Sequence, residues 1–127
     1  MTTMLRVLPL AILLVLAGCR TAPVYNVVSD SLSAPSNASL SQVTKAIKLA
    51  GANLGWAMTS KKPGHLVGKL AIRKHRAEVD IRYNTKTFSI TYRSSQNLKY
   101  DGTNIHSNYN GWIQRLRNAI LAQASAI

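Results

Sequence analysis

Thiols and carboxylates are scarce in this sequence of 127 residues. With one cysteine, the chain cannot form a scaffold of internal disulfides. Asp and Glu together number four, against sixteen Lys and Arg, so there is little material for the paired carboxylates of acid–base hydrolysis. The chain is also too short for more than one small domain. These shortages exclude a large multidomain enzyme and favour a small basic domain.

The N-terminal segment has the pattern of an export signal. Arg6 supplies a positive charge, and residues 7–17 form an apolar run that only Pro9 interrupts. Such a run is too short to span a bilayer core of about 30 Å. It leads into Leu16-Ala17-Gly18-Cys19, which resembles a bacterial lipobox, where the lipoprotein signal peptidase cuts before a diacylglycerol-modified cysteine. That resemblance makes Cys19 the lipid attachment site and the mature N-terminus.

Lipidation would place the protein in the bacterial cell envelope, anchored to a membrane and facing the periplasm. Two or more acyl chains hold a protein firmly on a bilayer, whereas one chain binds only marginally. Arg20, rather than an aspartate, follows the cysteine, and the sorting rules of enteric bacteria then favour the outer over the inner membrane. The alternative is an ordinary secretory peptide or an uncleaved helical anchor.

The chain divides into three predicted parts. Residues 1–18 are the signal peptide, residues 19–38 a lipidated tether and residues 39–127 the globular domain. The tether is rich in Ser, Ala, Pro and Asn, and a flexible chain of this length spans about 24 Å. Residues 24–28 are apolar enough to dock on the domain as a short extended piece.

The globular part predicts an α+β domain in the order α-β-β-β-α. A first helix begins after Ser39, which has capping-box spacing with Gln42, and ends before Trp56. Three stretches then alternate apolar and polar residues, namely 66–73, 76–83 and 87–93. A closing helix begins near Asn108. We expect a three-stranded antiparallel sheet with both helices on its apolar face.

Five short strings in this domain and in the segment before it carry a resemblance to a known group of proteins. They are PVYNV (23–27), Gly55-Trp56, RKHRAEVDIRY (73–83), SQNLKY (95–100) and IHSNYNGWI (105–113). Together they resemble a group of small proteobacterial lipoproteins, from Pro23 to about Ile120. The group has no assigned activity, so the resemblance implies the anchor and the domain boundaries but no catalytic residues.

No catalytic or metal-binding set is evident, and we expect neither an enzyme nor a cofactor. The three histidines, which have no close metal-ligand spacing, are His65, His75 and His106. Glu78 and Asp80 share one strand face, but the flanking arginines would hold both ionised rather than raise one pKa. A small hydrolase would need a deep pocket that joins one of the histidines to an acid.

The polar face of the predicted sheet is the first candidate for binding. Its cations, which we call the basic face, are Lys69, Arg73, Arg76, Arg82 and Arg93. Such a surface suits anionic lipid, lipopolysaccharide or an acidic protein, while nucleic acid is not expected outside the cytoplasm. The alternative is that these side chains only keep a small exported domain soluble.

A second hypothesis is an accessory subunit of an envelope protein complex. It would dock through an edge strand of the sheet or through an aromatic junction containing Tyr109 and Trp112. The alternative for these two aromatic residues is that they seal the contact between loop, helix and sheet.

Overall fold

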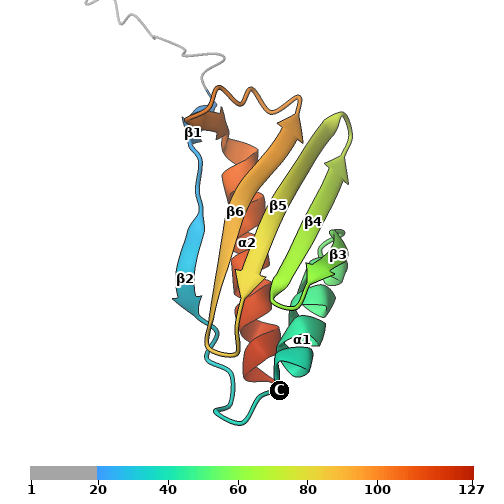
Figure 1. Cartoon of the computed structure of the whole chain (residues 1–127). Helices are drawn as coiled ribbons and strands as arrows, with labels where there is room; N and C mark the ends of the chain where they lie inside the picture. Colours follow the sequence, from blue (N-terminus) through green and yellow to red (C-terminus); the bar gives the residue numbers. More distant parts are fainter. Residues whose placement is uncertain (1–19) are drawn as a thin grey trace, which may run out of the picture.

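The computed structural model describes residues 20–127, so the predicted signal peptide and the lipidation of Cys19 lie outside the described residues. The described chain is an α+β fold with a five-stranded antiparallel sheet, a two-stranded sheet and two helices (Figure 1). Its elements are β1 (Thr21–Pro23), β2 (Val27–Ser31), α1 (Leu40–Asn53), β3 (Ala57–Lys62), β4 (His65–Ile72), β5 (His75–Tyr83), β6 (Thr87–Gln96), β7 (Asn104–His106) and α2 (Ser107–Ser125). None of the described helices is long and apolar enough to cross a membrane.

Helix α1 begins and ends where the sequence predicts. Ser39 caps it, since its hydroxyl accepts a hydrogen bond from the Gln42 backbone N–H at 3.1 Å. The Gln42 side chain accepts one from the Ser39 N–H at 2.9 Å, which completes the capping box. The helix buries Val43, Ile47 and Ala50 against the core. The predicted boundaries of this helix are confirmed.

Strands β4, β5 and β6 are the three that the alternating pattern predicts. On β5, Ala77, Val79 and Ile81 are buried on the side of the helices, and the residues between them face the other side. Antiparallel pairing joins β4 to β5 and β5 to β6. Both helices cover the apolar face of the sheet and leave the opposite face open (Figure 1).

The prediction of a three-stranded sheet is wrong in its strand number. The sheet has five strands in the order β2-β6-β5-β4-β3, so the two added strands form its edges. Strand β3 is almost wholly exposed and polar, and β2 contains a bulge between Val27 and Asp30. Neither segment has the period-2 alternation that marks a half-buried strand, because edge strands bury few side chains.

The predicted tether is also corrected, because residues 21–31 belong to the folded domain. Strand β1 pairs with β7, with Thr21 opposite His106. The Ser107 N–H donates a hydrogen bond of 2.7 Å to the Arg20 carbonyl, so the ordering reaches the first described residue. Farther along, Leu32 is fully buried in the core. Residues 24–28 were expected to dock on the domain. The contact with the domain in fact covers most of the predicted tether.

Tyr109 of α2 is the largest fully buried side chain among the described residues. Its ring meets Tyr92 edge-on, with centroids 5.9 Å apart. Its hydroxyl has no hydrogen-bond partner within residues 20–127, and burial raises the pKa of this phenol. An unpaired buried hydroxyl destabilises the folded state.

We expect Tyr109→Phe to raise the free energy of unfolding by about 1 kcal/mol, because it removes the unpaired hydroxyl and keeps the ring. Urea denaturation followed by circular dichroism measures this change. A loss of stability of similar size would contradict the prediction, since it would mean that the hydroxyl makes a stabilising hydrogen bond.

Candidate functional site: the basic face of the sheet

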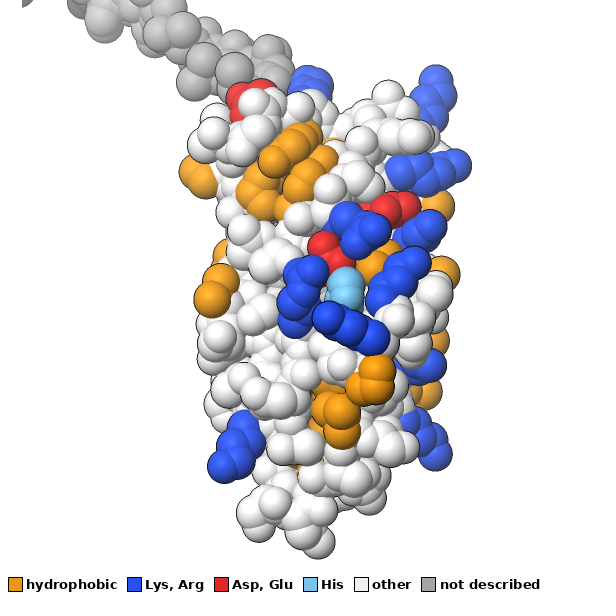
Figure 2. Space-filling view, viewed as in Figure 1, with side chains coloured by type: hydrophobic (Ala, Val, Ile, Leu, Met, Phe, Trp, Pro, Cys, Tyr) orange, Lys and Arg blue, Asp and Glu red, His pale blue; other side chains and the backbone are white. Residues whose placement is uncertain are grey.

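The open side of the sheet carries most of the basic face. Figure 2 shows Lys and Arg side chains gathered there around acidic side chains and a histidine. Lys69, Arg82 and Arg93 extend over this side, as the alternation predicts, and their side chains are 60%, 59% and 42% exposed. Arg73 and Arg76 lie instead at the turn between β4 and β5. The basic face therefore has a sheet part and a turn part.

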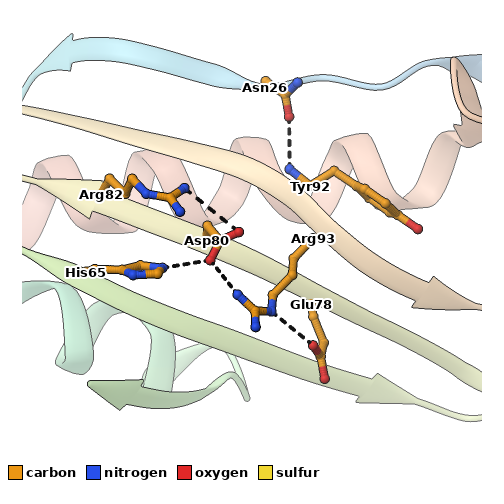
Figure 3. A network of polar contacts seen from close by, with 7 residues as sticks. All are labelled: Asn26, His65, Glu78, Asp80, Arg82, Tyr92 and Arg93. Atoms are coloured by element: carbon orange, nitrogen blue, oxygen red, sulfur yellow. Dashed lines mark hydrogen bonds and ion pairs between the residues drawn. The ribbon is translucent and has the colours of Figure 1, made fainter. Parts of the chain in front are cut away.

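Asp80 is the centre of the sheet part and the only buried charged residue in the described chain. One carboxylate oxygen accepts a hydrogen bond from His65 Nε2 at 2.7 Å and another from Arg93 Nη1 at 3.0 Å (Figure 3). The second oxygen lies 3.9 Å from Arg82 Nη1. The three partners come from three neighbouring strands, so Asp80 ties β4, β5 and β6 together.

Glu78 forms a weaker branch of the same cluster. Its carboxylate lies 3.3 Å from Lys69 Nζ and 3.6 Å from Arg93 Nε, and it is more exposed than Asp80. Arg93 reaches both carboxylates because of a bulge in β6. Tyr92 pairs with Val79 and Ser94 pairs with Glu78, which leaves Arg93 as the extra residue between them.

The charge cluster holds Asp80 ionised. Burial by itself would raise the pKa of this carboxyl, but the hydrogen bonds from His65 and Arg93 and the positive charge of Arg82 together lower it below its ordinary value. For Asp80 this confirms the expectation that neighbouring arginines keep the carboxylate ionised and do not raise its pKa. One expected partner differs, since Arg93 rather than Arg76 makes the close contacts.

Arg76 has a structural role in the turn part. Its Nη1 donates hydrogen bonds of 2.9 Å to the backbone carbonyls of Arg73 and His75. These bonds brace a two-residue turn in which Arg73 has a φ of 54°, a left-handed conformation that is uncommon for residues other than glycine. The braced turn presents the exposed side chains of Arg73 and Lys74.

The histidines have separate roles. His65 binds Asp80, while His106 caps α2 by accepting a hydrogen bond of 3.1 Å from the Asn108 N–H. His75 Nδ1 lies 2.7 Å from the Asn97 carbonyl, with its ring centroid 6.0 Å from that of His106. Within residues 20–127, no three His, Cys, Asp or Glu side chains are grouped as metal ligands.

His65 and Asp80 form an imidazole–carboxylate pair, the kind that a hydrolase uses to orient a general base. The hollow beside His65 has a volume of about 330 Å³ and includes Ser89 in its lining. The Ser89 hydroxyl accepts a hydrogen bond from the Ser29 N–H, and none of the described hydrogen bonds joins a nucleophile to His65. The geometry accounts for the pair as a structural tie between strands.

The aromatic junction differs from the predicted docking surface. Tyr109 is fully buried, so it is not available to a partner, and Trp112 is only partly exposed beside His75. Tyr100, which stacks on Tyr92 with centroids 4.0 Å apart, is 42% exposed. The sealing role is confirmed for Tyr109.

The two edge strands carry features that oppose unspecific pairing with further strands. Strand β2 contains its bulge at Ser29, where φ is 50°, and strand β3 ends in Lys61 and Lys62. Bulges and lysines are common devices that prevent unspecific edge-to-edge pairing.

Comparison with known proteins gives no family for this chain. No protein-family model matches it, and no curated protein or solved structure matches it either.

We expect Asp80→Asn to lower the free energy of unfolding by about 2 kcal/mol at pH 7, because Arg93 and His65 lose a buried anionic partner. Folding lowers the pKa of Asp80, so its ionised form stabilises the folded state above the ordinary aspartate pKa, and this contribution is lost as the pH falls through the lowered value. The difference between the two proteins should therefore shrink below about pH 4.

Urea denaturation at several pH values measures this effect, with Glu78→Gln as the matched control. The control should lose less than about 1 kcal/mol, because Glu78 is more exposed and makes longer ion pairs. Equal losses in the two variants, or a difference for Asp80→Asn that does not change with pH, would contradict the central role of Asp80.

Proposed function

We propose that this protein is a lipid-anchored, non-enzymatic binding module of the bacterial cell envelope, and that its basic face binds an anionic membrane surface. The observation that carries the proposal is the position of the chain's first described residues. Because β1 begins at Thr21, a lipid on Cys19 would be separated from the folded domain by Arg20 alone. A lipidated chain would then have almost no tether and would rest against the headgroups.

The turn part of the basic face lies at the same end of the molecule as β1. Thr21 pairs with His106, whose ring adjoins that of His75, the first residue of β5. Asn97 then joins this group to the turn, because its side-chain amide donates a hydrogen bond of 2.7 Å to the Lys74 carbonyl. In Figure 1, β1 and the β4–β5 turn both lie at the upper end.

Most charged side chains at this end are basic, and Asp101 in the turn before β7 is the acidic one. Burial, the neighbouring His75 and the positive charges of Lys99 and Arg20 lower the pKa of His106. A basic side chain close to an anionic leaflet contributes about 1 kcal/mol of attraction, which acts within a Debye length of about 8 Å. Direct attachment would keep these side chains within that distance.

The sheet part of the basic face supports the same proposal. Three cations of this part, Lys69, Arg82 and Arg93, outnumber the two carboxylates among them, Glu78 and Asp80, so the open side keeps a positive surface. No described helix covers this side (Figure 1), and an open sheet face suits an extended surface better than a small ligand. The outer membrane is the favoured location, and either anionic phospholipid or lipopolysaccharide supplies the required phosphates.

We expect vesicles that contain phosphatidylglycerol to protect the β4–β5 turn of the purified lipidated chain from hydrogen exchange, compared with vesicles of phosphatidylcholine alone. Arg73→Glu with Lys74→Glu should abolish this protection, because the pair would then be repelled by the anionic headgroups. High salt should weaken the protection in the natural sequence.

The matched control is Lys45→Glu with Lys48→Glu, which changes the net charge equally but lies on α1. This control should retain the protection of the turn. Equal exchange in both kinds of vesicle, or equal loss in both variants, would overturn the proposed contact.

A further inference from the structure

A second cationic surface lies between α1 and the end of β3. It is an open groove of about 740 Å³, and its four lysines are Lys45 and Lys48 of α1 and Lys61 and Lys62 of β3. We call it the lysine groove. All four lysines are exposed, and none of them makes an ion pair among the described residues.

Among residues 20–127, no acidic side chain forms an ion pair with the lysines of the groove. The chain has four acidic residues, and all of them are engaged elsewhere. Asp30 binds Arg117 at 2.6 Å, Glu78 and Asp80 belong to the cluster on the open side of the sheet, and the Asp101 carboxylate accepts backbone hydrogen bonds in its own turn. The arginines of the sheet are thus partly neutralised, whereas the lysines of the groove are not.

The floor of the lysine groove is apolar and braced. Leu40, Pro63 and Tyr83 contribute to its lining between the lysines. Thr44 donates a hydrogen bond to the Leu40 carbonyl, so its hydroxyl accepts from the Tyr83 hydroxyl, which joins α1 to β5. A preformed apolar floor between cations suits a ligand that has both carboxylates and apolar side chains.

We infer that the lysine groove binds an acidic, partly apolar peptide segment of a partner protein. Its lysines offer point charges to carboxylates, and its floor offers apolar surface to the side chains between them. Strand β3 runs beside the groove as the sheet edge, so its outer backbone groups are not paired to another described strand. An extended acidic segment would complete these hydrogen bonds, while the lysines would attract its carboxylates and repel basic strands.

The position of the groove also favours a protein partner over the anchoring membrane. In Figure 1 the start of α1 and the β3–β4 turn lie in the lower part, away from β1 at the upper end. With the chain attached at Cys19, the groove would face away from the bilayer. This step rests on the proposed function, whereas the charge and the shape of the groove do not.

A defined peptide titration tests the inference. The full chain is purified in nonionic detergent without added lipid, and fluorescence anisotropy follows a short labelled peptide of alternating Glu and Val residues. A second peptide has Gln in place of each Glu. We expect the Glu peptide to bind at least about tenfold more tightly than the Gln peptide, since each added ion pair contributes a modest increment.

Variants locate the binding. Lys45→Glu with Lys61→Glu should weaken binding of the Glu peptide about tenfold or more, and Lys45→Gln with Lys61→Gln should weaken it less, in proportion to the charge removed. The matched control, Lys74→Glu with Lys99→Glu, makes the same charge change outside the groove. It should change the affinity by less than about threefold, the effect of net charge alone.

Three results would overturn the inference: equal binding of the Glu and Gln peptides, equal loss in the groove and control variants, or full displacement of the peptide by inorganic phosphate at matched ionic strength. The last result would identify a phosphate site instead. Because no bilayer is present, failure here leaves the vesicle experiment unaffected, and failure of the vesicle experiment leaves this titration unaffected.

Discussion

The pairing of β1 with β7, continued by the hydrogen bond from Ser107 to Arg20, is the constraint on which the rest of the account depends. It joins the start of the described chain to the start of the last helix, so the segment between Arg20 and α1 closes the fold instead of extending from it. Strand β2 then completes one edge of the sheet. A lipid on Cys19 would consequently fix which end of the domain meets the bilayer. The distance of each other surface from the membrane would then depend on its place in the fold.

The scarcity of carboxylates determines how the positive charge is distributed. With four acidic residues in the whole chain, the place of each decides which cations are neutralised. Asp80 and Glu78 draw Lys69, Arg82 and Arg93 into a cluster that ties three strands together. The turn between β4 and β5 and the lysine groove have no such partners, so they remain the strongest candidates for contacts with anions outside the chain.

The features that local pattern determines were predictable from the sequence. Ser39 and Gln42 fix the start of α1, and period-2 alternation places Lys69, Arg82 and Arg93 on one side of the central strands. The edge strands were not predictable in this way, because they bury few side chains and are ordered mainly by backbone pairing with distant neighbours. The same reason explains why the N-terminal segment resembled a tether.

The candidate site was predictable only in part. Glu78 and Asp80 lie together as expected, because they share one face of β5. The contact of Asp80 with His65 depends on the register between β4 and β5, which the sequence pattern does not give. The contact of Asp80 with Arg93 depends on a bulge in β6. The lysine groove has two lysines from α1, Lys45 and Lys48, and two from the polar strand β3. The sequence pattern does not show that these two segments lie side by side, because only the tertiary fold brings them together.

The most direct test is the intact mass of the mature chain purified from bacterial membranes, with fragmentation of its N-terminal peptide. We predict a chain that begins at Cys19 and carries a diacylglycerol thioether and an amide-linked acyl chain. An unacylated thiol at Cys19, or a leader that is still attached, would contradict this prediction.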